Sequence, residues 1–504
     1  MMVVNVKIIK ERKIYNMYSA YITKLKNIRP HPNADRLNLA ECFGNTVVIG
    51  KDYDEDTLYI YFPTDGQLSE EYATINNLVR KKDDAGNNIG GYLDPDKRNI
   101  RAIRLRGEKS DGLVMPLESV AYTGADVSEF QEGIVIHMLN GHEICCKYVP
   151  RRPSGRYSGN GNRTRKKKVP VAPLFAEHAD TEQLAYNLSA FRPGDQIEIT
   201  LKMHGTSQRT GYLPVIKHWV GSPIAFDIIE RKGLFKIFKP NKKMIEWAEA
   251  SIEPIYDWGY VSGTRRTVLE DYEGGYYGSN EFREQHSKVF EGKLQKGETV
   301  YYEVVGFTSN GTPIMSSCDN KKLNDKEFVK TYGKETVFSY GCRPDTGWKD
   351  IQTDNEIPQS DIYVYRMTMT NEDGYVVEYT PDFMRYRCEQ MGVKTVPVMW
   401  KGTIPIDDED FESFIPGEEN SVPQITFLTP GEWIKDRAEE FYEGPDPIGK
   451  THIREGVVVR IINRPKFAAY KHKNFEFKVL EGLIKETAEA PDMEEADGIE
   501  EGEI

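Results

Sequence analysis

Hydrophobic and polar residues alternate in short runs along most of this chain, and that period of two predicts β-strands. In residues 17–148 the runs are brief and separated by turn-forming residues, as in "TVVIG", "TLYIYFP" and "GIVIHML", which favours a small β-barrel. In residues 171–483 they are longer, as in "DQIEITLK", "ETVYYEVVGF" and "REGVVVRIIN", and helical patterns such as "TEQLAYNLSAF" lie between them. We therefore predict an α+β protein, with an N-terminal barrel followed by a domain of antiparallel sheets flanked by helices.

Three segments lack such patterning and are predicted to lie outside the two domains. Residues 1–16 form an N-terminal extension, with Met17 as an alternative start. Residues 149–170 contain "RRPSGRYSGNGNRTRKKK", a basic linker that either is simply solvated or also holds a phosphate backbone. Residues 484–504 are rich in acidic side chains, which predicts a disordered tail.

Composition narrows the class of protein. A length of 504 residues favours two or three domains. No apolar run approaches the roughly 18 residues of a membrane span, and no signal peptide is evident, so we expect a cytoplasmic protein that does not enter a membrane. Six scattered cysteines form no CxxC pattern, which predicts reduced thiols and no zinc site. The net charge of −13 argues only weakly against nucleic acid, because basic residues are clustered.

The N-terminal module contains the run "RPHPNADRLNLAECFGNTVVIG" at residues 29–50, where two prolines exclude a helix. It resembles the "HPxADRL" segment of the tRNA-binding OB-fold modules attached to some aminoacyl-tRNA synthetases, and "FPTDGQLS" continues the resemblance. Residues 17–148 are therefore expected to be an OB-like nucleic-acid-binding module. A group of basic residues either contacts nucleic acid or packs against the neighbouring domain: Lys97, Arg98, Arg101, Arg104 and Arg106.

A lysine followed by a turn of small polar residues ends one predicted strand, in "ITLKMHGTSQ" at residues 199–208. A lysine amine is a weak nucleophile while protonated, but a cationic or desolvated site lowers its pKa. Lys202 would then attack the α-phosphorus of ATP and release pyrophosphate, provided that cations and a metal offset the charge on the phosphates. The alternative is a surface lysine before a glycine turn.

Groups suited to that chemistry follow Lys202 in order on predicted strands. They are Glu303 in "YYEVVGF", Tyr363 and Tyr365 in "IYVYRM", Glu455 in "REGVVV", and Lys471 and Lys473 in "YKHKNFEFK". Each has a plain structural alternative, namely a solvent-facing carboxylate, core aromatics or a charged sheet edge. The complete ordered set is a stronger signal than any member alone.

This set resembles the covalent nucleotidyltransferase superfamily of ATP-dependent ligases and mRNA-capping enzymes, whose first motif is Lys-x-Asp-Gly. His204 stands at the aspartate position, and "KMHGTS" is similar to the KxHGT(N/S) variant of RNA ligases. With an OB-like module in front, the chain from about residue 17 to 480 resembles the Deinococcus-type RNA ligase family. DNA ligases and capping enzymes instead carry an OB domain after the catalytic domain, and few residues follow Leu480 here.

The resemblance implies that residues 171–483 are a nucleotidyltransferase domain and gives each residue of the set a role. Lys202 would form lysyl-AMP, and Glu455 would help hold a catalytic Mg²⁺ or Mn²⁺ ion. Tyr365, or else Tyr363, would stack on adenine. The implied nucleotide-binding residues are His204, Gly205, Glu303, Tyr363, Tyr365, Lys471 and Lys473. Arg265 and Arg266 in "SGTRRTVLE" would bind phosphate or an RNA end, or else form a surface pair.

The implied enzyme is a monomeric ATP-dependent RNA ligase. It would join 3′-OH and 5′-phosphate ends of RNA through lysyl-AMP and RNA-adenylate intermediates, as in the sealing of nicks during RNA repair. Three alternatives stay open: a DNA ligase, a capping guanylyltransferase that uses GTP, and an RNA-binding protein on a decayed ligase scaffold. The "KMHG" motif and the domain order disfavour the first two, whereas the intact set of candidate residues disfavours the third.

Overall fold

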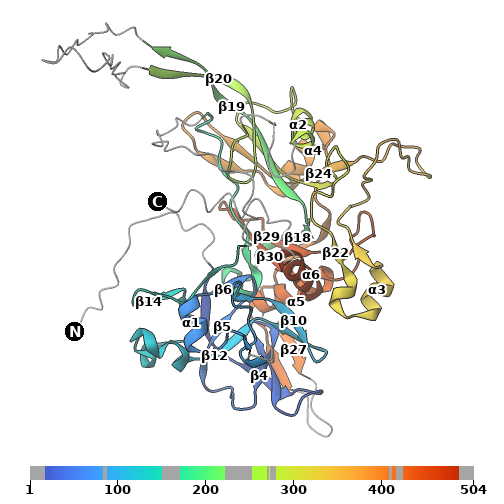
Figure 1. Cartoon of the computed structure of the whole chain (residues 1–504). Coiled ribbons are helices and arrows are strands. Elements are labelled where there is room, and N and C mark those ends of the chain that lie inside the picture. Colours follow the sequence, from blue (N-terminus) through green and yellow to red (C-terminus); the bar gives the residue numbers. More distant parts are fainter. Residues whose placement is uncertain are drawn as a thin grey trace, which may run out of the picture.

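A computed structural model describes residues 18–82, 88–149, 171–221, 252–269, 272, 280–407, 411–415 and 424–486 (Figure 1). The N-terminal extension predicted from the sequence lies outside the described residues. The basic linker and the acidic tail lie outside them too, apart from the first few residues at their borders.

Residues 18–149 form small antiparallel sheets, the largest with the strand order β12-β5-β1-β13. The strands of this sheet are β1 (Ala20–Lys24), β5 (Leu58–Phe62), β12 (Leu113–Pro116) and β13 (Val135–Ile136). The next elements are β2 (Lys26–Pro30), β3 (Leu37–Cys42), β4 (Asn45–Gly50), β6 (Gly66–Leu68), α1 (Glu70–Ile75), β7 (Lys81–Lys82) and β8 (Asn88–Gly90). Those that follow are β9 (Asn99–Ile100), β10 (Ala102–Leu105), β11 (Glu108–Asp111), η1 (Leu117–Thr123), η2 (Val127–Glu129), β14 (Met138–Leu139), β15 (His142–Glu143) and β16 (Cys145–Lys147).

Strand β5 is buried on both faces, because alternate residues of a strand point to opposite sides of the sheet. Ile60 and Phe62 pack into one hydrophobic cluster of the module, whereas Tyr59 and Tyr61 pack into a second. The predicted closed barrel is not found: among the described residues no sheet closes on itself. Only Leu25 separates β1 from β2, and Asn27, with a φ of 51°, turns β2 away to pair with β3 in a sheet of its own.

Residues 171–486 are built on two five-stranded sheets. Their orders are β17-β30-β29-β18-β26 and β20-β19-β21-β24-β25, called here the first and the second sheet. The first sheet contains β17 (Glu182–Gln183), β18 (Gln196–Lys202), β26 (Val398–Thr403), β29 (Gly456–Ile461) and β30 (Ala468–Lys473). The second contains β19 (Thr206–Gly221), β20 (Ile252–Gly263), β21 (Glu298–Gly306), β24 (Ser360–Thr370) and β25 (Val376–Glu378). Apart from the β17–β30 pair, all neighbouring strands are antiparallel, which confirms the predicted α+β class with antiparallel sheets.

Helices cover the outer faces of the two sheets. Helix α5 (Pro430–Tyr442) packs on the first sheet through Ile434 and Ala438, and α4 (Pro381–Met391) packs on the second. The other helices are α2 (Glu281–Lys288), α3 (Lys326–Tyr332) and α6 (Phe475–Glu486). The remaining short elements are η3 (Leu184–Tyr186), η4 (Leu188–Ala190), β22 (Cys318–Asp319), η6 (Asn320–Leu323), β23 (Glu335–Thr336), β27 (Glu412–Ile415) and β28 (Gln424–Phe427).

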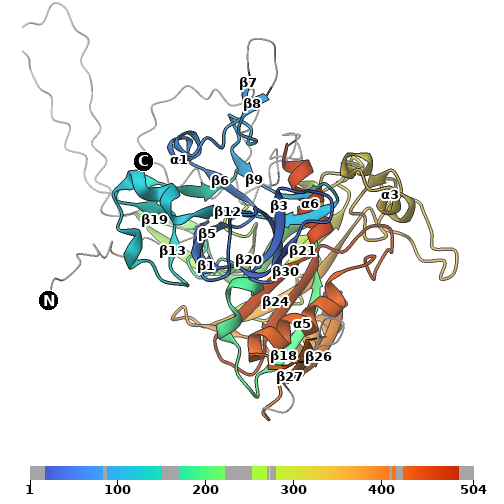
Figure 2. The ribbon, with the colours of Figure 1, turned by 90° about the horizontal axis from the view of Figure 1, so that it is seen from below.

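Tyr186 and α6 are among the elements that join the N-terminal module to the rest of the chain. Tyr186 enters the second cluster of the module, where its ring stacks on Tyr21 with centroids 4.6 Å apart. Figures 1 and 2 both place α6 beside β10. Among the described residues, no helix has both the length and the apolar character needed to cross a membrane.

Candidate functional site

Lys202 ends β18, an inner strand of the first sheet, at the point where the chain crosses to the second sheet. The crossing takes only Met203, His204 and Gly205, because β19 begins at Thr206. In β18, Lys202 pairs with Gly456 of the neighbouring strand β29. Lys202 therefore lies where the two sheets meet, directly before this short crossing.

Glu455 is the anion to which the lysines of the site converge. Its side chain is only 2% exposed, and one oxygen lies 2.8 Å from Lys202 Nζ and 3.2 Å from Lys473 Nζ. The other oxygen lies 3.6 Å from His204 Nδ1, too far for a hydrogen bond. Burial raises the pKa of a carboxyl group, but the charges of Lys202 and Lys473 outweigh it and hold the pKa of Glu455 well below its usual range.

Lys471 and Lys473 lie on the same face of the first sheet as Lys202. Lys473 pairs with Gly456 across β29 and β30, which puts it in line with Lys202, and Lys471 is two residues earlier on the same strand. The pKa of Lys471 is lowered to about 7. The causes are burial and then the nearby charges of Lys473, Lys147, Lys202 and Arg265.

His204 and Gly205 fix the crossing between the sheets. The backbone N–H of His204 donates to the Tyr340 hydroxyl at 2.7 Å, and its ring makes edge contacts with Phe338 and Phe477. A Cβ atom at Gly205 would lie 2.4 Å from the carbonyl oxygen of Val304. The crossing therefore requires glycine because the backbone of β21 is so close.

Gly205→Ala is expected to destabilise the protein by about 1–3 kcal/mol, because the added methyl group overlaps backbone that cannot move cheaply. The same displacement should separate Lys202 from the second sheet and slow nucleotidyl transfer. Thermal unfolding of this variant would be compared with that of Gly90→Ala, since nothing lies within 4 Å of a Cβ at Gly90. Equal unfolding midpoints for the two variants would contradict the expectation.

The second sheet contributes Glu303, Tyr363 and Tyr365 to the region opposite Lys202. Glu303 lies in β21, directly across from Ser207 on one side and Tyr363 on the other. Ser207 Oγ and the Tyr365 hydroxyl are 2.8 Å apart, and the Tyr365 side chain is partly exposed. Tyr363 is only 5% exposed, and it packs in the cluster that contains Leu201 and Met203. Tyr365 packs against the same cluster but keeps part of its surface exposed.

Arg265 and Arg266 follow β20, and both are anchored by one carboxylate. Each guanidinium lies 3.0 Å from an oxygen of Asp180. The buried Arg209 of β19 also donates to the carbonyl oxygens of Thr264 and Arg266 and so fixes this turn. The charge of Arg265 is near enough to the lysine cluster to lower the pKa of Lys471.

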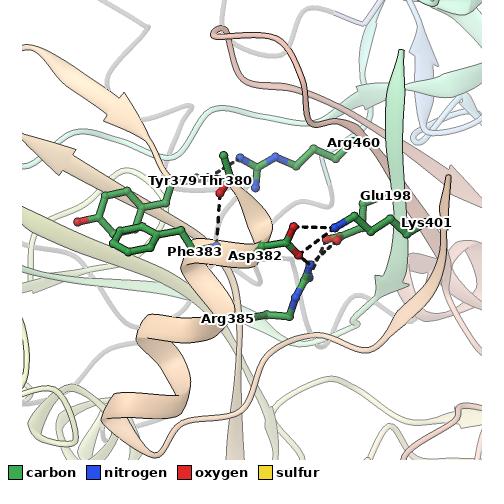
Figure 3. Close-up of polar contacts among 8 residues, drawn as sticks. All are labelled: Glu198, Tyr379, Thr380, Asp382, Phe383, Arg385, Lys401 and Arg460. Carbon is green, nitrogen blue, oxygen red and sulfur yellow. Dashed lines mark hydrogen bonds and ion pairs between the residues drawn. The ribbon is translucent and has the colours of Figure 1, made fainter. Parts of the chain in front are cut away.

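An ion-pair network braces the strand that carries Lys202. Both oxygens of Glu198, four residues before Lys202, accept hydrogen bonds from Arg385 of α4 at 3.0 and 2.7 Å (Figure 3). Asp382, in the first turn of the same helix, bonds Arg385 and Lys401 of β26. Thr380 caps the start of this helix by accepting the backbone N–H of Phe383 at 3.3 Å.

Two further residues contact the site but were not predicted from the sequence. Tyr340 lies in the polar, turn-rich segment 308–360, yet its hydroxyl accepts the His204 N–H, and the signal available was the alternation of aromatics in "VFSYG". Glu481 of α6 binds Lys473 Nζ at 2.8 and 2.9 Å. Its helical position two turns beyond the lysine is the only trace of this contact in the sequence.

The described residues of the site offer a divalent cation one carboxylate oxygen but not a complete set of protein ligands. Glu455 Oε2 is buried and has no hydrogen-bond partner among the described residues, which suits a hard cation or its water. No group of three or more His, Cys, Asp and Glu side chains within the described part of the chain could hold a metal by itself. That donor set fits Mg²⁺ or Mn²⁺ bound by one carboxylate together with substrate phosphates and water.

The comparisons with known proteins find similarity only among solved structures, since no family model and no curated protein matches the chain. A lysine-to-alanine variant of Naegleria gruberi RNA ligase with ATP and manganese aligns at 14% identity and a TM-score of 0.48, over 91% of this chain and 98% of that one. A glutamate-to-alanine variant of the same ligase with AMP and manganese aligns at 13% identity and a TM-score of 0.45, over 91% and 97%. The identity and the TM-score of both matches are low.

Proposed function

We propose that the chain is an ATP-dependent RNA ligase of the Deinococcus type that forms lysyl-AMP on Lys202. One observation carries the proposal: the Lys202 amine contacts the buried Glu455, beside Lys473, where the two sheets meet. Burying a carboxylate among several lysines costs free energy, because each charge must be desolvated. Such clusters of charge are typical of functional sites. An incoming phosphate would replace part of that negative charge.

In the first step, the lone pair of Lys202 Nζ forms a bond to the α-phosphorus of ATP. The bond from that phosphorus to the bridging oxygen of pyrophosphate breaks, and pyrophosphate leaves with the electron pair. Lys202 must first give its proton to water, and it is held in line meanwhile by Glu455. Lys471 and Lys473 would offset the negative charge that builds on the phosphate oxygens. A bound Mg²⁺ or Mn²⁺ ion, with Glu455 among its ligands, would supply further neutralisation.

In the second and third steps, AMP passes to the 5′-phosphate of RNA, and a 3′-hydroxyl then displaces it. A 5′-phosphate oxygen attacks the phosphorus of lysyl-AMP, which breaks the P–N bond and returns the amine to Lys202. The 3′-oxygen next attacks the activated 5′-phosphorus, so that a phosphodiester forms and AMP leaves. The OB-like N-terminal module and Arg265–Arg266 are proposed to hold the RNA, which we expect to be a nicked duplex.

The test is transfer of label from nucleotide to protein and then to RNA. The full chain would be incubated with magnesium and α-labelled ATP or, separately, GTP, denatured and examined for bound label. Label from ATP alone that is discharged by 5′-phosphorylated nicked RNA is the expected result. Label from GTP would favour a capping guanylyltransferase, and discharge only by nicked DNA would favour a DNA ligase. A folded protein that takes no label would be an RNA-binding protein on a ligase scaffold.

Binding of ATP is expected to take up a proton near pH 7. In the protein without ATP, the pKa of Lys471 (its free pKa) is about 7. A bound phosphate favours the ammonium form of Lys471, so this pKa rises when ATP binds. By linkage, ATP affinity then falls as the pH rises above the free pKa. Calorimetry at about pH 7.5 in two buffers of different ionisation enthalpy measures this uptake. In Lys471→Arg it should vanish, because the guanidinium stays protonated in both states, and uptake that persists would contradict the assignment.

A further inference from the structure

Helix α6 begins two residues after Lys473 and lies between the candidate site and the N-terminal module. Asn474, fully buried, fixes its start: its side chain accepts the backbone N–H of Phe477 at 2.8 Å and donates to the carbonyl oxygen of Arg454. Figures 1 and 2 both show α6 beside β10 of the module. The helix is thus connected to the site along the chain and to the module through space.

One side of α6 contacts the candidate catalytic residues. Glu481 binds the Lys473 ammonium at 2.8 and 2.9 Å, while Glu455 binds it at 3.2 Å. Phe477, fully buried, makes an edge contact with the His204 ring at a centroid distance of 4.9 Å. Lys473 is therefore held between two carboxylates. When a phosphate binds, Lys473 could leave Glu455 and keep its contact with Glu481.

The same helix also contacts the module. Lys478 donates to Asp111 at 2.5 Å, and the two side chains are only 16% and 6% exposed. Glu476 pairs with Arg104, and the guanidinium of Arg104 also lies over the ring of Phe475. Arg104, which the sequence placed either on nucleic acid or against a neighbour, therefore contacts the neighbouring domain. An ion pair that is shielded from water in this way holds its geometry better than an exposed one.

The two sets of contacts are linked through one turn of helix. Lys478 and Glu481 are three residues apart and so lie on the same surface of α6. They line a small cavity together with Asp65 and Tyr148 of the module. The charge of Lys147, next to Tyr148, is also near enough to affect Lys471. The last strand of the module therefore reaches the edge of the lysine cluster.

We propose that the N-terminal module takes part in nucleotidyl transfer by positioning Lys473: Asp111 holds Lys478, and Glu481 of the same helix holds the Lys473 ammonium. Glu481 and Asp111 are positioning residues, because they act through Lys473 and not on the substrate. With Glu481 as a fixed anchor, Lys473 can exchange Glu455 for the α-phosphate without losing its place. This inference rests on the proposed function and adds a task for the module besides RNA binding.

The experiment compares Asp111→Asn, Glu481→Gln and the double variant in the full chain. Initial rates of AMP transfer from labelled ATP would be measured over a range of ATP concentrations, together with binding of nicked RNA. Each single variant is expected to lower the maximal rate roughly 10- to 100-fold, with a smaller change in the KM for ATP. The double variant should lose little more than the worse single variant, because both changes interrupt one path. RNA affinity should stay within about twofold of wild type.

Two controls separate positioning from folding. Glu71→Gln removes an exposed module carboxylate that pairs with His142 and not with α6, so its rate should match wild type. Exchanging the partners in Asp111→Lys/Lys478→Asp should recover much of the rate that either single change loses. Tyr186 still anchors the module in all of these variants, and equal unfolding midpoints would verify that they fold.

Each outcome has a definite meaning. Wild-type rates in Asp111→Asn and Glu481→Gln would overturn the inference and leave the proposed function intact. Rate losses that multiply in the double variant, or a loss of RNA binding at an unchanged rate of AMP transfer, would also overturn it. If the wild-type protein itself takes no label from ATP, the proposed function fails, and the inference fails with it.

Discussion

Lys202→Ala is expected to abolish formation of protein-bound AMP, with a loss of at least about 1000-fold, because no other group can replace a missing nucleophile. The side chain of Lys202 is only 22% exposed, but its charge is not the sole partner of Glu455, which keeps its ion pair with Lys473 after the substitution. The fold should therefore persist. The measurement is label from α-labelled ATP on the denatured protein, alongside the thermal unfolding midpoint.

The variant also separates the steps of the reaction. Once RNA is supplied already adenylated at its 5′ end, Lys202 is no longer needed to accept AMP, so Lys202→Ala should retain far more sealing activity than it shows with ATP. Lys401→Ala is the matched control. Lys401 lies on β26, the strand next to β18, and its ammonium pairs with Asp382 of α4 (Figure 3). Label that persists in Lys202→Ala would move the nucleophile to another residue, and label lost in Lys401→Ala would indicate damage to the sheet.

The pattern of the sequence predicted those features that depend on neighbours along the chain. Strand β18 was evident from alternation in "QIEITLK", and the glycine turn after Lys202 required a change of direction. The places of Glu303 and Lys473 on later strands, and of Glu455 directly before one, follow from the same periodicity. That these residues should be close in space came from the resemblance to a family, because nothing in the alternation of a strand identifies the strand it pairs with.

Contacts between distant segments could not be predicted in this way. Glu481 lies in a helix with an ordinary amphipathic pattern, so its bond to Lys473 appears only once α6 is placed. The sequence left Arg104 two uses, contact with nucleic acid or with the neighbouring domain, and the contact with Glu476 appears only in the structure. The closed barrel was wrong for a similar reason: the spacing of short strands predicts a β-rich module, but the turn at Asn27 determines which strands pair.

Replacing Glu455 by glutamine should lower the rate of AMP transfer at least about 100-fold. The amide would keep the shape of the side chain and lose the charge that holds Lys202 at 2.8 Å and Lys473 at 3.2 Å. It would also weaken the oxygen ligand proposed for the metal ion. Initial rates at several magnesium concentrations would measure both effects, and magnesium should not fully restore the rate because Lys202 has lost the carboxylate that holds it.

The same substitution should reduce stability in a pH-dependent way. The pKa of Glu455 is lowered in the folded protein, so the stability that its charge contributes is fully present above the unfolded pKa of about 4.3 and is lost as the pH falls toward the folded pKa. The gap in unfolding free energy between wild type and Glu455→Gln should therefore be largest near neutral pH and narrow below about pH 4. A gap that widens in acid would mean that the carboxyl group is protonated in the folded protein.

A second buried carboxylate separates the catalytic loss from the structural one. Glu298, the first residue of β21, is fully buried and binds Arg387 and Tyr379. Glu298→Gln should destabilise the protein by about 3–5 kcal/mol, as expected when one partner of a buried pair is removed. The molecules that still fold should transfer AMP at nearly the wild-type rate, because the groups that Glu298 binds lie away from the lysines of the site. A comparable loss of rate in both variants would mean that Glu455 acts only through stability, since burial is what the two carboxylates share.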